Sequence, residues 1–126
     1  MALGDPLRDG SYFLRLALDT EVRRTHERAL LRHHLDARAA TRGRAIAWDD
    51  AWHRHRIHAA HTVPASCQAL VATEDAGARA REFPDTFLAR AVAVVEDLEA
   101  PEAVTGALAS QGCQRTLERA PTSPKA

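Results

Sequence analysis

Residues 84–98, PDTFLARAVAVVEDL, carry the clearest structural signal in the chain. Their apolar side chains recur at intervals of three and four, which is the period of one face of an α-helix. Pro84 either occupies the first turn of this helix or kinks a helix that begins near Ala78. No segment alternates with a period of two over a useful length, so the sequence predicts an all-α fold. The apolar stripe consists of Phe87, Leu88, Ala91, Val92, Val95 and Leu98.

A second helical pattern precedes this one and begins near Asp49. Pro64 lies inside the pattern, removes a backbone N–H and crowds the carbonyl of Ala60, so it should kink or split the helix. Residues 73–77, TEDAG, form the expected connection to the next helix. One stripe of the pattern has a period of 3.6 residues, and it contains Trp48, Trp52, His55, Ala59, Val63, Ser66 and Leu70.

A long helix is predicted nearer the N-terminus. It begins at Asp19 or Thr20 and ends near Ala40, and Gly43 is placed for a left-handed helix stop. We expect the two histidines of its apolar row to lie in the core with hydrogen-bond partners, and Arg23 beside that row to be solvated. The row is formed by Val22, His26, Leu30 and His34, with Leu31 and Leu35 beside it.

A short first helix is predicted over residues 12–18. Asp9 is placed to accept hydrogen bonds from the free N–H groups of its first turn. Tyr12, Phe13 and Leu16 then share one face of this helix.

The C-terminal region shows a change of character. Pro101 can open a last short helix that ends near Ala109. Beyond it, Gly, Ser, Thr and Pro punctuate a polar stretch of the kind that is typical of disorder. The sequence therefore predicts one helical domain over residues 1–109, a small bundle of four to five helices, and a disordered tail over residues 110–126.

Composition argues against two classes of partner. Seventeen basic side chains balance seventeen acidic ones, so no overall field attracts nucleic acid or an anionic membrane. No apolar run approaches the length that spans a bilayer, and the first residues do not have the pattern of a signal peptide. Cys67 and Cys113 lie far apart without the spacing of metal ligands, as expected for reduced thiols. These features predict a cytoplasmic protein.

Charge is unevenly distributed along the chain. Residues 1–60 contain eleven arginines and eight acidic residues, whereas residues 74–102 contain three arginines and eight acidic residues. We expect these two segments to pack against each other as complementary faces.

Histidines are the first candidates for chemistry, because the chain contains seven. His55, His58 and His61 follow one another at intervals of three, and neighbours at that spacing can share a metal ion. However, the row turns about the helix axis by roughly 60° per step, and no carboxylate lies among its members. We therefore predict no metal site, and expect a half-exposed basic face with His55 partly covered beside Trp52.

Three further stretches form a pattern. Residues 4–14, 21–31 and 48–56 have the sequences GDPLRDGSYFL, EVRRTHERALL and WDDAWHRHR. The first stretch resembles the GdPlrDlaYFL segment of small-molecule phosphotransferases, a family that includes aminoglycoside phosphotransferases, choline kinases and ecdysteroid kinase-like enzymes. Residues 21–31 resemble the next helix of that family, and residues 48–56 are similar to the W-x-x-x-W-x-x-x-R opening of the helix after it. The resemblance covers roughly residues 4–98.

The resemblance implies a helical acceptor-substrate lobe at the C-terminal end of a kinase-like fold. Asp9 matches an aspartate that orders a loop and caps a helix, so its role is structural. Trp52 and Arg56 match a pair one turn apart, with an aromatic face and a planar fork for an anionic or hydroxylated small molecule. Tyr12 can approach from the first helix. Packing in the core is the alternative for both Trp52 and Tyr12.

The chain departs from the family pattern at three positions. His34 stands where Tyr is usual, and Gly10 and Ser11 stand where Leu and Ala are usual. The presence of Gly10 and Ser11 weakens the predicted first helix.

The catalytic motifs of the family do not occur in the printed sequence. That family uses ATP and Mg²⁺, which it holds with an H-x-D-x-x-x-x-N motif, a second metal motif and an upstream Lys. This chain contains no Asn and its single Lys is Lys125. We therefore predict no catalytic residue, no bound cofactor, and a truncated or split phosphotransferase whose partner is a catalytic chain or a second copy. The alternative is a stand-alone helical binding module.

Overall fold

The computed structural model describes residues 5, 7–72 and 77–118, without the side chains of residues 80, 81, 117 and 118. Over these ranges the chain is helical and contains no strand, which confirms the all-α class. The helices are α1 (Arg8–Leu16), α2 (Thr20–Arg42), α3 (Trp48–Ala59), α4 (Thr62–Ala72), α5 (Ala78–Asp97) and α6 (Ala100–Glu118). None of them is long and apolar enough to cross a membrane.

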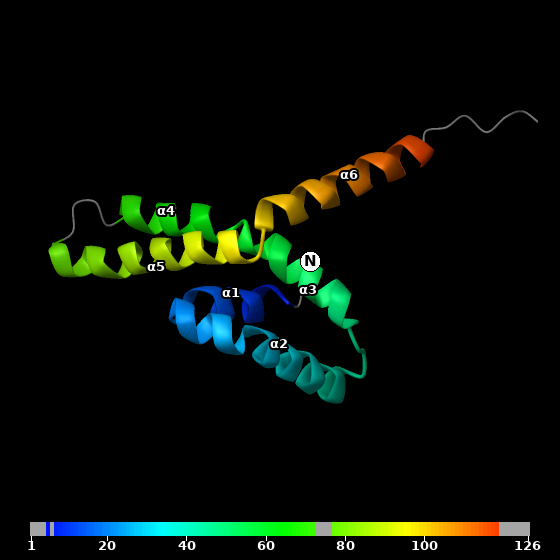
Figure 1. Cartoon of the computed structure of the whole chain (residues 1–126), viewed down its shortest axis with the longest axis horizontal. Coiled ribbons are helices and arrows are strands. Elements are labelled where there is room, and N and C mark those ends of the chain that lie inside the picture. The colour runs from blue at the N-terminus through cyan, green and yellow to red at the C-terminus, as the bar shows by residue number, and fades with distance from the viewer. Residues whose placement is uncertain (1–4, 6, 73–76, 119–126) are drawn as a thin grey trace, which may run out of the picture.

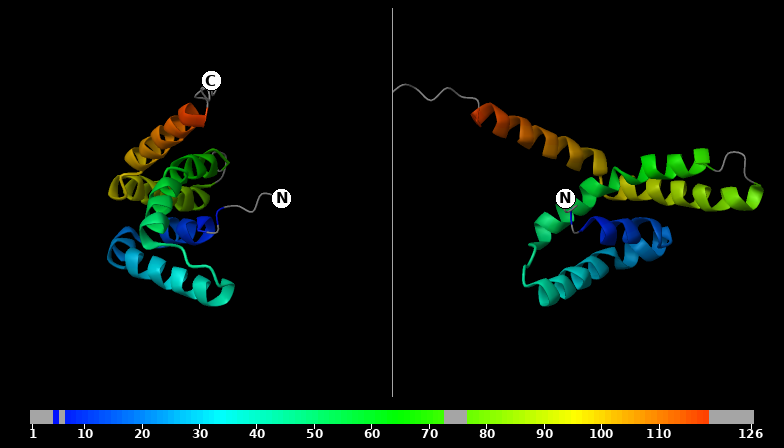
Figure 2. Two further views of the ribbon diagram at one scale, coloured as in Figure 1. Left: turned by 90° about the vertical axis from the view of Figure 1, so that its right-hand side faces the viewer. Right: turned by 180° about the vertical axis from the view of Figure 1, so that it is seen from behind.

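The helices form an open, elongated arrangement (Figure 1). Helices α4 and α5 run side by side as an antiparallel hairpin, and α1 packs against the base of that hairpin and against α2 and α3. Helix α6 starts against α3 and α5 and then leaves the other helices, as the views in Figure 2 also show. Helix α1 therefore contacts both α2 and α3 on one side and the α4–α5 hairpin on the other.

Two prolines settle questions that the sequence left open. The expected long helix is split, because residues 60 and 61 form a turn and Pro64 lies in the first turn of α4. The missing N–H of a proline costs no helical hydrogen bond at that position. Pro84, in contrast, lies inside a continuous α5, so the helix that begins near Ala78 is the correct alternative.

Helix α1 begins at Arg8 rather than at Tyr12. The predicted cap is wrong: Asp9 is exposed in the first turn, and the N-cap residue is Leu7, which has no side-chain cap. Asp5 takes the expected role instead, because its Oδ1 accepts a hydrogen bond of 3.0 Å from the backbone N–H of Leu7. Because the helix begins earlier than predicted, Asp5 is the aspartate that precedes it, and its carboxylate can reach a free N–H.

The buried face of α2 differs from the predicted row by one residue. The buried side chains are Arg23, Glu27, Leu31 and Leu35, so the expectation of a solvated Arg23 is wrong. Val22 is 45% exposed, His26 is exposed and His34 is half-buried, so a core position for His26 is also wrong. The apolar pattern predicted the wrong row because two of the four buried residues, Arg23 and Glu27, are charged. The predicted helix stop is confirmed, since Gly43 adopts φ 66° at the C-cap.

Helix α6 extends well beyond its predicted end. It continues to Glu118, so residues 110–118, which were expected in a disordered tail, are helical. The remaining part of that expected tail, residues 119–126, lies outside the described residues.

Two apolar clusters hold the fold together. The first lies between α1, α2 and α3, and the second lies where α3, α5 and α6 meet. Trp52 packs against both clusters, so it links the two halves of the core. The first cluster contains Leu7, Leu14, Leu31, Leu35 and Ala51, and the second contains Ala59, Val94, Leu98 and Ala100.

Neighbouring leucines of α2 provide a test of this face. Leu31 is fully buried and Leu30 is 39% exposed. We expect Leu31→Ala to lower the free energy of unfolding by about 2–5 kcal/mol, because it removes buried methyl groups and leaves a cavity. Leu30→Ala is the matched control and should cost clearly less in the same urea titration followed by circular dichroism. Equal losses would contradict the observed face of α2.

Candidate functional site

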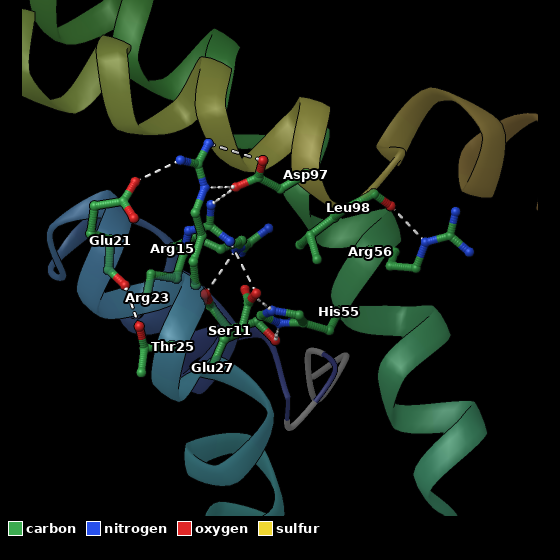
Figure 3. Close-up of polar contacts among 11 residues, drawn as sticks. Ser11, Arg15, Glu21, Arg23, Thr25, Glu27, His55, Arg56, Asp97 and Leu98 are labelled. Atoms are coloured by element: carbon green, nitrogen blue, oxygen red, sulfur yellow. Dashed lines mark hydrogen bonds and ion pairs between the residues drawn. The ribbon is translucent and has the colours of Figure 1, made fainter.

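A buried polar network joins helices α1, α2 and α3 (Figure 3). Glu27 of α2 lies at its centre. Its Oε2 accepts a hydrogen bond of 3.0 Å from Arg23 Nη1, and its Oε1 lies 2.8 Å from His55 Nε2. His55 Nδ1 lies 2.9 Å from the hydroxyl oxygen of Ser11 on α1. Since the carboxylate next to Arg23 is an acceptor, His55 Nε2–H donates to it, and a neutral ring then accepts the Ser11 O–H through Nδ1.

Helix α5 joins this network through Asp97. The carboxylate accepts hydrogen bonds from Arg23 and from Arg24, with Arg24 Nε 2.8 Å from Oδ2 and Arg24 Nη2 3.1 Å from Oδ1. The hydrogen bonds from Arg24, followed by those from Arg23, hold the pKa of Asp97 below its usual value, although burial opposes this shift. These ion pairs join the arginine-rich and acidic segments, as the uneven charge distribution predicted.

The connectivity of Ser11, His55 and Glu27 has the elements of a hydrolytic triad. A nucleophile, however, must reach its substrate, and both Ser11 and His55 are 0% exposed. The network therefore serves the packing of four helices, and no substrate can approach its hydroxyl group. This network could not be predicted from the sequence, because Ser11 and His55 are far apart in the chain. The available signal was the Arg23–Glu27 spacing of four, which is that of a helical ion pair.

Arg15 is a second buried cation in this region. It is 2% exposed, and its Nε donates a 2.8 Å hydrogen bond to the carbonyl of Ser11. Its Nη1 is buried without a hydrogen-bond partner within the described part of the chain. Burial lowers the pKa of Arg15 to about 10, against the opposing effects of Glu27 and Tyr12. Glu27 is thus an acidic group that offsets part of this charge.

The structure places Trp52 and Arg56 one turn apart on α3, and both contact other protein groups. The Trp52 ring is half-buried, stacks on Trp48 with centroids 5.6 Å apart, and lies 4.2 Å from the guanidinium of Arg28. Tyr12, in contrast, is 44% exposed and does not lie in the core. The contacts of Trp52 and Arg56 are explained without a ligand, and their role in binding stays a prediction.

Arg56 holds the corner between α5 and α6. Its Nε donates a 2.6 Å hydrogen bond to the carbonyl of Leu98, which is the C-cap of α5, and its Nη2 donates to the carbonyl of Glu99 at 3.2 Å. Glu99 has φ 48°, a left-handed conformation that is uncommon outside glycine. Arg56 therefore pairs with the C-cap carbonyl of α5, at a helix C-terminus where a cation is favoured.

The histidine row is divided among different contacts. His55 is fully buried in the network rather than partly covered, His58 Nε2 lies 2.9 Å from Asp5 Oδ2, and His61 is exposed. Over the ranges that the structure describes, no group of three His, Cys, Asp or Glu side chains is placed to hold a metal ion. Cys67 and Cys113 are free and exposed.

Helices α4, α5 and α6 present an apolar surface. A groove of about 490 Å³ lies where these helices meet. Further along α6 every described side chain from Leu108 to Thr116 is exposed, and Leu108 itself is 62% exposed. The groove is lined by Ala60, Val63, Pro64, Val95, Pro101, Val104 and Thr105.

Comparisons of the chain with protein-family models, with curated proteins and with solved structures found no match. Function must therefore be argued from the geometry of this chain and from the resemblance of its three sequence stretches.

The charge of Glu27 is expected to be essential for stability. Glu27→Ala leaves Arg23 and His55 buried without their shared acceptor, and the loss of one partner of a buried ion pair costs about 3–5 kcal/mol. Glu21→Ala is the matched control, because Glu21 pairs with Arg24 on the surface of the same helix. Such surface pairs contribute below about 1 kcal/mol. Urea denaturation of both variants measures the difference, and similar losses would refute the central position of Glu27.

Asp97 should make the stability depend on pH. The pKa of Asp97 is lower in the folded chain than in the unfolded one. Its stabilising effect is therefore complete at pH values above the ordinary carboxyl pKa, which is near 4. The effect is lost as the pH falls through the lower pKa of the folded state. We expect wild type to be more stable than Asp97→Asn at neutral pH, and this gap to shrink on acidification. Thermal unfolding at a series of pH values tests it, and a constant gap would contradict the assignment.

Proposed function

We propose that this chain is a non-catalytic helical lobe that packs onto the catalytic part of a phosphotransferase-like protein. The observation that carries the proposal is the uncovered surface of α6 and of the adjacent groove. A helix that makes no tertiary contacts is marginal in water when it is shorter than about 12–15 residues. The exposed second half of α6 therefore gains stability when another polypeptide covers it.

The groove beside α6 has the chemistry of a protein contact. Its lining is formed by side chains of Ala, Val, Pro and Thr from α4, α5 and α6, without a charged group. Val71 and Phe83 of the hairpin are also exposed, at 71% and 62%. An apolar groove of this kind marks interaction sites in soluble proteins.

The resemblance suggests the kind of partner. In that family the helical lobe contributes to the acceptor site, while a separate part of the protein holds ATP and Mg²⁺. The printed sequence lacks the Asn and the upstream Lys that this chemistry requires. In this proposal the nucleotide, the metal and the catalytic base all belong to the partner.

One observation favours the second candidate, a stand-alone binding module. The network of Arg23, Glu27 and His55 is closed, because it satisfies the Glu27 carboxylate and both His55 nitrogens with groups of this chain. A network that pairs these groups within the chain supports independent folding of α1, α2 and α3. The two candidates therefore differ in whether another polypeptide binds the exposed surface of α6.

The association state tests this difference. Without its partner, the wild-type chain should self-associate in sedimentation experiments, because the apolar faces of α4 and α6 cover each other in trans. Leu108→Glu places a charge in that face and should shift the chain toward monomer. Gln111→Glu is the matched control, since Gln111 is exposed on the same helix and adds the same charge. A monomeric wild type with high thermal stability would favour the stand-alone module.

Calorimetry with Mg-ATP provides the second readout of the same proposal. The chain alone should neither bind nor hydrolyse ATP, since it lacks the groups that grip phosphates and metal. ATP turnover that survives repurification would overturn the assignment as a non-catalytic lobe.

A further inference from the structure

A separate cavity lies at the junction of α2 and α3. This junction is away from the α4–α5 hairpin (Figure 1). The volume of the cavity is about 420 Å³, which is within the range of small-molecule sites. Three cationic side chains and one carboxylate line it, together with a short apolar stretch of the connecting loop. The lining consists of Arg38, Arg44, Ala45, Ile46, Ala47, Asp50 and Arg54.

The charges of this cavity are not balanced by the protein. Arg54 is neutralised, because its Nη2 lies 2.9 Å from Asp50 Oδ2 and its Nη1 lies 3.7 Å from Asp5 Oδ1. Arg38 and Arg44 have no ion pair among the residues that the structure describes. In addition, Arg38 Nε is buried and lacks a hydrogen-bond partner there.

The loop that completes the cavity is fixed at both ends. Gly43 ends α2 in the left-handed conformation, and Ile46 packs against the first apolar cluster. Ala47 is the N-cap of α3 and provides no side-chain acceptor for the N–H groups of the first turn. These N–H groups carry partial positive charge next to the cavity, although Asp49 and Asp50 offset part of it. The backbone that carries Arg38 and Arg44 is therefore held in position before a ligand binds.

We propose that this cavity binds a small phosphate monoester through Arg38 and Arg44. The planar guanidinium forks match the oxygens of a phosphate in a bidentate manner. A phosphate dianion balances the two unpaired cations, and its oxygens accept hydrogen bonds from the terminal nitrogens of these guanidinium groups. Ala45 and Ile46 provide apolar surface for the organic part of the ligand. This site goes beyond the proposed docking function, because none of its lining residues belongs to α4, α5 or α6.

The test uses the full chain and glycerol 3-phosphate at low ionic strength. Trp48 directly follows the lining residue Ala47, and the guanidinium of Arg32 lies 4.0 Å from its ring, so tryptophan fluorescence should report binding. Calorimetry gives the affinity independently. We expect Arg44→Gln to weaken binding at least about tenfold, because it removes a charge-assisted contact. Arg38→Gln should weaken it similarly, with circular dichroism to verify folding.

Arg42→Gln is the matched control, since Arg42 is exposed at the end of α2 and does not line the cavity. It should leave the affinity unchanged apart from a small effect of net charge. Equal weakening by Arg42→Gln and Arg44→Gln would overturn the site in favour of a diffuse field. Absence of binding to wild type would show that Arg38 and Arg44 only balance the carbonyls at the end of α2. Equally tight binding of succinate would overturn the phosphate assignment.

Discussion

The ion pair and hydrogen bond that Glu27 makes with Arg23 and His55 are the constraint on which the other helices depend. An ionised carboxylate is stable in a buried position only when cations and donors surround it. Meeting that requirement brings α3 against α2 through His55, α1 against α3 through Ser11, and α5 against α2 through Arg23 and Asp97. The apolar clusters are small and contain several alanines, so they specify the relative rotation of these helices less sharply than the directional polar contacts do.

Much of the helical framework could be predicted from the sequence, because periodicity, proline and glycine act locally. Gly43 ends α2 as expected, and Pro64 splits the pattern of α3 and α4. The buried face of α2 could not be predicted from hydrophobicity, since Arg23 and Glu27 are buried while Val22 is exposed. Likewise, the cap of α1 was assigned to Asp9 because spacing alone does not show where a helix begins. Long-range polar contacts and the convergence of Arg38 and Arg44 require the folded chain.

Two positions at which the chain departs from the phosphotransferase pattern are in contact with each other. A Cβ atom at Gly10 would lie 3.1 Å from His34 Nε2, so the glycine makes room for this ring. Next to it, Ser11 provides the hydroxyl group that His55 contacts. Gly10 and Ser11 were expected to weaken the first helix, but both have a definite role in packing α1 against its neighbours. The departures are therefore consistent with one another, whatever the origin of the chain.

The contact of Arg56 with the corner at Glu99 also bears on how the chain meets other molecules. A residue with φ 48° is held in an unfavourable backbone region, and the guanidinium compensates by binding the carbonyls of Leu98 and Glu99. Together with the packing of Ala100 in the second apolar cluster, this side chain of α3 helps to fix the angle at which α6 leaves the bundle. In the docking proposed above, a partner that binds α6 loses little conformational entropy at this corner, and a change at Arg56 would alter the rate and geometry of docking without touching the contact surface itself.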